Sequence, residues 1–144
     1  RSEADVLSGS ASAPSPFRNG LVGKLAGPVI NRFYGEAVEI DLLLDDGDRL
    51  PGSIEIDIIH TPGHTPGSIC LYLPKLRLLM VGDALQYRFH RLSPAARASS
   101  QDRPQAIESL KKLLEFEVET MCFGHFDPLP GDVAGSIRKV IAKH

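Results

Sequence analysis

The sequence predicts an α/β domain in which a mixed β-sheet is flanked by helices. Short apolar runs separated by Gly, Pro and Asp fill residues 54–81, and this pattern is typical of strands joined by turns. Two later segments, after Asp102 and after Asp132, space their apolar residues at three and four positions, as amphipathic helices do. The chain has 144 residues, 42% of them hydrophobic, which is enough for one domain with a buried core.

The N-terminal third carries weaker patterns. A helix end is expected at residues 1–7, and residues 8–16, which are rich in Ser, Ala and Pro, are expected to form a mobile loop. A short helix is expected near 21–25, a strand at 38–44 and a turn at 45–48. Because neither an internal repeat nor a linker interrupts the chain, residues 1–144 are predicted to form a single domain.

The central segment has the clearest strand signals. A strand is expected at 54–59, followed by a hairpin whose strands are 69–73 and 78–81. A further strand is expected at 118–123. Residues 84–100 show no clear period and are expected to be a long loop.

The two helices have capping signals. Asp102 precedes the first helix, Pro104 lies in its first turn and Gln105 follows the cap by three residues. This helix is expected to extend to Phe116, with its lysine pair, including Lys112, on a solvated face. The second helix is expected to start at about Asp132.

Composition narrows the classes of partner. The net charge of −2 gives no electrostatic reason to expect nucleic acid or an anionic membrane. No apolar run approaches the ~18 residues that span a bilayer. The two cysteines, Cys70 and Cys122, are expected to be free thiols in apolar strands, which favours a cytoplasmic location.

His64 lies in a loop that is unusually rich in stiff turn residues. Pro62 and Gly63 precede it, and Pro66 and Gly67 follow it closely. A metal ligand needs such stiffness, because a poorly held ligand loses affinity. The loop therefore indicates His64 as a candidate metal ligand.

Asp83 and His125 occupy the same kind of position in the chain as His64. His64, Asp83 and His125 each follow the C-terminal end of a predicted strand, where the loops of such sheets gather to build sites. Two imidazoles and a carboxylate suit Zn²⁺ well, and Fe or Mn less exclusively. The spacing alone leaves alternatives open: His64 bonded to its own loop, Asp83 capping the next segment, and His125 completing a turn.

Three stretches resemble sequence motifs of a known family. His60–Ser68, Val81–Asp83 and Phe123–His125 are similar, in order and spacing, to three motifs of the metallo-β-lactamase superfamily. The resemblance implies the C-terminal half of a four-layer αββα sandwich with a two-metal site at one edge. It also implies roles for three residues. His64 resembles a ligand of the first zinc, Asp83 the carboxylate that bridges both metals, and His125 a ligand of the second. Apart from the resemblance, His60 is expected to bond to its loop and support the ligands rather than bind metal itself.

The family's strongest motif, H-x-H-x-D-H, is absent, because the first histidine of the chain is His60. We therefore expect a fragment that lacks half of the metal ligands, binds metal weakly or not at all, and is inactive alone. The resemblance implies that the parent is a metal-dependent hydrolase of a small ester, thioester, amide or phosphoester. Tyr87, Arg88 and His90 are candidates for lining its substrate pocket, although a solvated loop is the alternative.

Two other hypotheses remain open. In the first, the chain is a non-catalytic half-domain that forms a homodimer, or binds a partner protein or the missing N-terminal half, through an uncovered sheet face. In the second, a single zinc binds His64, Asp83 and His125 together with water.

Overall fold

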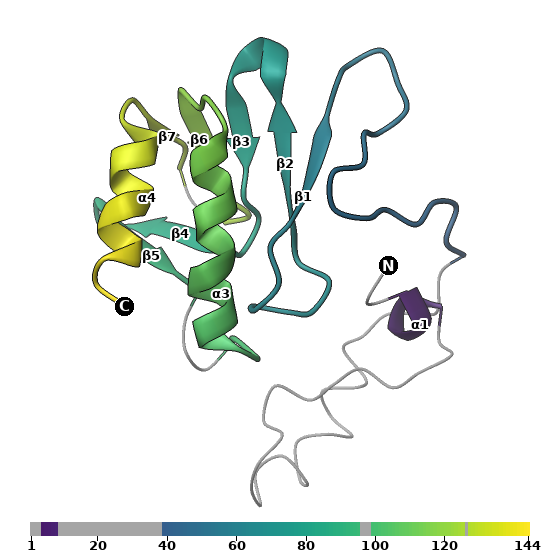
Figure 1. The fold of residues 1–144 in the computed structure, drawn as a ribbon, viewed down its shortest axis with the longest axis horizontal. Helices are drawn as coiled ribbons and strands as arrows, with labels where there is room; N and C mark the ends of the chain where they lie inside the picture. The colour runs from purple at the N-terminus through teal and green to yellow at the C-terminus, as the bar shows by residue number, and fades with distance from the viewer. Residues whose placement is uncertain (1–3, 9–38, 96–98, 126) are drawn as a thin grey trace, which may run out of the picture. The chain divides into compact units, whose positions relative to one another are not determined.

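A computed structural model describes the chain at residues 4–8, 39–95, 99–125 and 127–144 (Figure 1). The chain divides into two compact units, Arg1–Leu43 and Leu44–His144. The described part of the first unit contains helix α1 (Ala4–Leu7), where the sequence predicts a helix end. The mobile loop predicted at 8–16 lies outside the described residues from position 9 onward, as does the short helix predicted near 21–25.

A five-stranded mixed sheet forms the centre of the second unit, as the sequence predicts. Its order is β1-β2-β3-β6-β7, in which β3 and β6 are parallel and the other neighbours are antiparallel. The strands are β1 (Asp57–His60), β2 (Ile69–Leu73), β3 (Leu78–Met80), β6 (Thr120–Cys122) and β7 (Leu129–Pro130). The parallel pair places the ends of β3 and β6 at the same sheet edge, which is where the candidate site lies.

The predicted hairpin of β2 and β3 is confirmed. The short 3₁₀ helix η1 (Pro74–Leu76) connects the strands, and Arg77 closes it in the left-handed conformation with φ 46°. Proline suits the first position of such a turn because its ring fixes φ. The register then pairs Leu71 with Met80 and Leu73 with Leu78.

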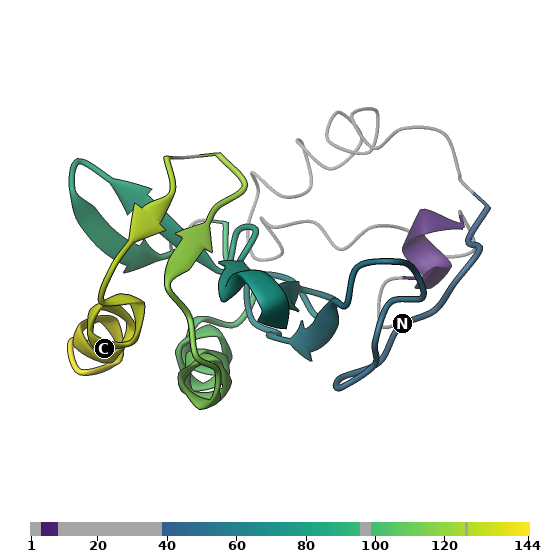
Figure 2. The ribbon, with the colours of Figure 1, turned by 90° about the horizontal axis from the view of Figure 1, so that it is seen from above.

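Both C-terminal helices pack on one face of the sheet (Figures 1 and 2). Helix α3 (Arg103–Ser109) continues into the 3₁₀ helix η2 (Leu110–Glu115), and α4 (Val133–Ile141) lies beside them. The Asp102 carboxylate accepts a hydrogen bond from the Gln105 amide at 2.9 Å, and Asp132 caps α4 in the same way. These caps confirm the predicted helix starts.

The two faces of the sheet differ in their burial. Alternate strand residues face the helices and form the core with Leu110, Leu113 and Ile137: Ile59, Cys70, Tyr72, Leu79 and Met121. On the opposite face Ile69 and Met80 are 39% and 44% exposed. The core therefore lies between the sheet and its helices, and the other apolar face is partly open to solvent.

Two predicted strands differ in the structure. The described residues 39–44 form no strand, and Leu42 and Leu43 are 52% and 42% exposed. Alternating apolar residues there are not enough, because a strand also needs a neighbour to hydrogen-bond. Strand β1 begins at Asp57 rather than Ile54, which is 56% exposed.

Residues expected to be a loop instead contain a second, two-stranded sheet. Strand β4 (Leu85–Arg88) pairs with β5 (Arg91–Pro94) through a two-residue turn. The turn residues Phe89 and His90 have φ values of 51° and 57°. Such turns are usually recognised by Asn or Gly, so this hairpin has no clear sequence signal. No helix in the described part of the chain is long and apolar enough to cross a membrane.

Candidate metal centre

The loop that carries His64 is anchored to the start of α3. The Asp102 amide donates to the Gly63 carbonyl at 2.8 Å, and the Gln101 amide donates to the His64 carbonyl at 3.1 Å. Gly63 has φ 134°, and a Cβ atom there would overlap the backbone of Ala106. The loop backbone thus lies directly against the helix, which only glycine permits at this position.

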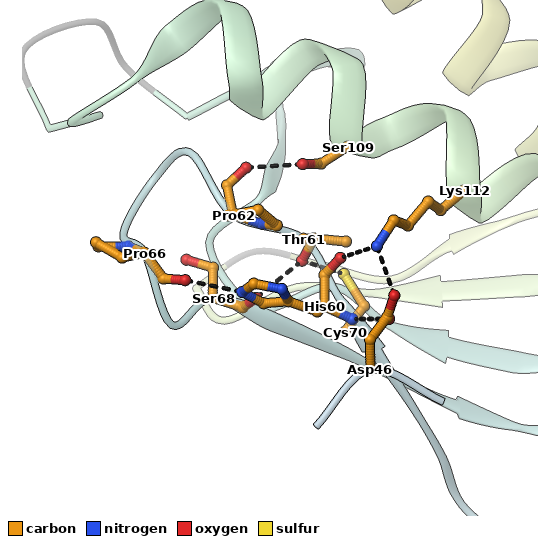
Figure 3. Close-up of polar contacts among 9 residues, drawn as sticks. All are labelled: Asp46, His60, Thr61, Pro62, Pro66, Ser68, Cys70, Ser109 and Lys112. Atoms are coloured by element: carbon orange, nitrogen blue, oxygen red, sulfur yellow. Dashed lines mark hydrogen bonds and ion pairs between the residues drawn. The ribbon is translucent and has the colours of Figure 1, made fainter. Parts of the chain in front are cut away.

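The same loop is also closed by bonds of its own. The Thr61 amide donates to the Ser68 carbonyl at 2.9 Å, and the Thr65 amide donates to the Ser68 hydroxyl oxygen at 3.0 Å. From the helix side, the Ser109 hydroxyl donates to the Pro62 carbonyl at 2.8 Å (Figure 3). These bonds hold the backbone on both sides of His64.

A three-residue polar network supports the base of the loop (Figure 3). Lys112 Nζ donates to Asp46 Oδ2 at 2.7 Å and to the His60 carbonyl at 3.0 Å, and the His60 amide donates to Asp46 Oδ1 at 2.7 Å. Partial burial raises the pKa of Asp46, but the bonds from Lys112 and His60 and the charge of Lys112 hold that pKa below its usual 3.8. The sequence predicts Lys112 on a solvated helix face, whereas in the structure Lys112 forms an ion pair with Asp46.

His60 and Cys70 make contacts within and beside this loop. The His60 ring nitrogen Nε2 bonds to the Pro66 carbonyl at 2.8 Å. The buried Cys70 thiol lies 3.3 Å from the Thr61 hydroxyl and 3.8 Å from the Val81 carbonyl. Burial raises the pKa of Cys70 to about 11, so the thiol remains protonated and can donate.

Asp83 lies three residues after the end of β3. Val81 is 0% exposed, and Gly82 turns the chain outward with φ 52°. The Gly124 amide donates to the Gly82 carbonyl at 3.1 Å, which ties the chain after β6 to the chain after β3. Asp83 and His125 are brought to the same edge by this contact.

The structure brings His64, Asp83 and His125 together. His64 Nε2 lies 3.9 Å from Asp83 Oδ2, and His125 Nε2 lies 3.5 Å from Asp83 Oδ1. Both separations are within ion-pair distance and longer than a typical hydrogen bond, and each imidazole faces a different oxygen of the Asp83 carboxylate. The side chains are 20%, 42% and 71% exposed for His64, Asp83 and His125, respectively.

The two donor-atom separations at Asp83 can be compared with those in a metal site. Two ligands at ~2.0–2.2 Å from a tetrahedral ion lie about 3.3–3.5 Å apart, close to the His125–Asp83 separation and slightly below the His64–Asp83 one. The buried His64 Nδ1 has no hydrogen-bond partner among the described residues. Within the same residues, no group of three or more His, Cys, Asp or Glu side chains is already arranged to hold an ion. The arrangement is therefore two histidines that share one carboxylate.

The residues predicted to line a substrate pocket lie on the β4–β5 hairpin. The Tyr87 ring stacks on the Phe123 ring with centroids 6.1 Å apart. The Tyr87 and His90 rings form a T-shaped pair with centroids 6.3 Å apart. Both Tyr87 and His90 line a pocket of about 270 Å³. The Arg88 guanidinium instead lies over the Phe89 ring at 4.9 Å. The substrate role of these residues stays a prediction.

The sequence reasoning missed the network of Lys112, Asp46 and His60. Asp46 and Lys112 are 66 positions apart, so no local pattern connects them. The only sequence signal is that Asp46 lies in the turn predicted at 45–48, a few residues before the predicted strand that leads to His60.

Comparisons with known proteins agree with the geometry. The family model of the metallo-β-lactamase superfamily matches residues 3–125. A probable metallo-hydrolase of Bacillus subtilis (strain 168), YflN, is 30% identical over 125 residues, which cover 79% of this chain and 47% of that protein. A hydroxyacylglutathione hydrolase of Chelativorans sp. (strain BNC1) is 35% identical over 88 residues, covering 60% of this chain and 32% of the relative.

A solved structure is also similar. TTHA1623 in a di-iron-bound form is 27% identical with a TM-score of 0.54, and the match covers 78% of this chain and 55% of that one. Some curated relatives match this chain over most of its length. The chain spans only about half of the length of those relatives, for example 47% of YflN.

Proposed function

The chain belongs to the metallo-β-lactamase superfamily, and from this we propose that it contributes three metal ligands to a metal-dependent hydrolase. The proposed ligands are His64, Asp83 and His125. One observation carries the proposal: the two oxygens of Asp83 face two different imidazoles, at 3.9 and 3.5 Å. A carboxylate so placed suits a bridge between two ions, because each oxygen has a histidine beside it.

Each residue has a distinct part in the proposed site. His64 presents Nε2 from a loop that is bonded on both sides, so its position is set before binding. Asp83 supplies the negative charge that offsets the metal charge, and His125 supplies a second imidazole from the exposed side. Metal ions held in such a site provide the Lewis-acid chemistry that activates water for hydrolysis.

The metal and the substrate follow from donor chemistry and from relatives. Imidazole and carboxylate donors suit Zn²⁺, and also Fe, so zinc is the proposed metal and iron or manganese the alternatives. One similar structure is described as di-iron-bound. Relatives named as a metallo-hydrolase and a hydroxyacylglutathione hydrolase support hydrolysis of a small ester or thioester, with amides and phosphoesters as further classes.

Three ligands are few for two ions. Catalytic zinc sites commonly use three protein ligands for one ion, so two ions would share only His64, Asp83 and His125 here. We therefore expect weak zinc binding and little or no hydrolysis by the 144-residue chain alone.

Zinc titration tests the proposal. The wild-type chain, Asp83→Ala and the control His144→Ala are titrated against a chromogenic chelator, with elemental analysis for stoichiometry. We expect Asp83→Ala to remove most of the zinc affinity and His144→Ala to leave it unchanged, because His144 lies at the chain end beside Arg103. Equal affinity of wild type and Asp83→Ala would contradict the proposal. One zinc per chain would favour a single ion held by all three ligands.

A second candidate function is association through the open sheet face. Ile69 and Met80 on that face are 39% and 44% exposed, and apolar patches of this kind mark interaction sites. We expect light scattering to find a dimer that Met80→Lys dissociates. The control is Leu76→Lys, because Leu76 is 62% exposed on η1 and its replacement should not matter. A monomer at all concentrations would count against this function.

A further inference from the structure

A small cationic pocket lies between the β4–β5 hairpin and α4. Its volume is about 270 Å³, and no acidic residue is among those that line it. Three cationic side chains line it: Arg91 from β5, and Lys139 and Lys143 from the C-terminal part of α4 and the turn after it. All three are exposed, so their charged groups are accessible to a ligand.

These cations differ from four others in the second unit. Arg49, Arg77, Lys111 and Lys112 each pair with a carboxylate at 2.6–2.9 Å. In the described part of the chain no carboxylate pairs with the three pocket cations. Lys139 and Lys143 line the same pocket, so their like charges repel each other. An anion between them would relieve that repulsion.

The pocket has an apolar floor beside its positive charges. Tyr87, Leu92 and Val140 form part of the lining, and Val140 is only 4% exposed. The Ser136 hydroxyl at the pocket already donates its hydrogen bond to the Asp132 carbonyl at 2.9 Å. The attraction for an anion therefore comes from the cationic side chains. Such a lining suits a ligand that joins an anionic group to a short apolar stem.

One residue of the pocket lining, Tyr87, lies near the candidate metal centre. The Tyr87 ring stacks on Phe123, which lies two residues before His125. Along the chain Tyr87 follows Asp83 by four residues, and four extended residues span at most about 14 Å. The Cα atoms of Asp83 and of Tyr87 in the pocket lining are therefore no more than about 14 Å apart.

We propose that this pocket binds the anionic end, a carboxylate or a phosphate, of the substrate whose cleaved bond lies at Asp83. The proposal rests on the hydrolase function proposed above. It narrows the substrate class from esters and thioesters in general to those that carry a negative charge on a short arm.

Binding to the metal-free chain tests the pocket without relying on hydrolysis. Inorganic phosphate, monoethyl succinate and diethyl succinate are titrated in a chelator-containing buffer into the isotope-labelled 144-residue chain, with detection by NMR. We expect phosphate and monoethyl succinate to shift the signals of Arg91, Lys139 and Lys143 saturably, and salt to weaken the effect. Diethyl succinate, which has the same carbon chain without a charge, should cause no such shifts.

Matched variants distinguish binding in the pocket from nonspecific attraction to positive charge on α4. Lys139→Gln should weaken monoethyl succinate binding about tenfold, the effect of one lost charge-assisted contact. Arg138→Gln, which removes the neighbouring charge on α4 outside the pocket lining, should leave binding unchanged. Equal weakening by both variants, equal shifts with diethyl succinate, or no saturable shift would each overturn the proposal.

The outcome is distinguishable from a failure of the proposed function. Equal zinc affinity of wild type and Asp83→Ala would overturn the hydrolase function. It would not alter anion binding measured in chelator, so the pocket would stand as an anion site. Conversely, normal zinc binding with no anion binding would overturn only the pocket.

Discussion

The two candidate histidine ligands are held very differently. His64 lies in a loop whose backbone is bonded to the start of α3 and to itself, and its side chain is 20% exposed. His125 follows Gly124 at the end of a short strand, and its side chain is 71% exposed. An exposed side chain loses more rotamer freedom when it binds a metal than one that is already packed. The comparison indicates that folding alone positions the His64 side chain, whereas the His125 side chain would be ordered only when a metal binds.

This difference has a structural cause. The cap of α3 serves two purposes, because Asp102 accepts from Gln105 and its own amide donates to Gly63. The helix start and the His64 loop are therefore one unit. The chain at His125 is tied through the bond from the Gly124 amide to the Gly82 carbonyl. Changes near His64 should alter stability, whereas changes near His125 should alter the site with little change in stability.

The largest effect should come from Gly63→Ala. Its Cβ would overlap the backbone of Ala106, and φ 134° is unfavourable for alanine. We expect a loss of about 3 kcal/mol or more in the free energy of unfolding, measured by urea denaturation. Gly131→Ala is the control, because φ is 95° there but the space is open, and about 1 kcal/mol is expected. Similar urea midpoints for both variants would show that the loop is not packed against α3.

Gly124→Ala should reduce zinc affinity while changing stability little, in contrast to Gly63→Ala. A Cβ at this position would lie 3.0 Å from Asp83 Oδ1, so it would displace the carboxylate oxygen that faces His125. We expect less than about 1 kcal/mol of lost stability, as for an exposed position, and about a tenfold loss of zinc affinity. Zinc competition and urea denaturation on the same samples measure both quantities. A stability loss as large as that of Gly63→Ala would remove the contrast between the two regions.

A smaller effect is expected from Asp46→Asn as the pH changes. The folded-state pKa of Asp46 is lowered below 3.8, so its carboxylate stabilises the fold above that pH and loses the effect as the pH falls through the folded-state pKa. The stability difference between wild type and Asp46→Asn should therefore be constant from pH 5 to 7 and shrink below about pH 4. Urea midpoints across this range measure it. A difference that grows as the pH falls would contradict the role of Lys112 in holding this charge.

Much of the central fold was predictable because its signals are local. The β2–β3 hairpin follows from a turn at Pro74, and the start of α3 follows from Asp102 and Gln105. His64 and His125 were expected near Asp83 because each follows a strand end, and the parallel pairing of β3 and β6 brings the ends after them together. Their roles as metal ligands stay predictions.

Other features could not be predicted because their causes are not local. The β4–β5 turn has positive φ at Phe89 and His90, which neither residue type signals. Lys112 and Asp46 are paired by tertiary packing across 66 positions. The strand predicted over residues 38–44 had the right alternation, but its described part, 39–44, forms no strand.

The most direct test of the account follows the imidazole nitrogens by NMR during zinc titration of the 144-residue chain. We predict that the ring signals of His64 and His125 shift together and saturate at the same zinc concentration, and that Asp83→Ala abolishes this coupling. The ring of His60, bonded to the Pro66 carbonyl, should not respond. A zinc response at His60 or His144 without a joint response of His64 and His125 would contradict the claim that these two histidines share the Asp83 carboxylate in one metal centre.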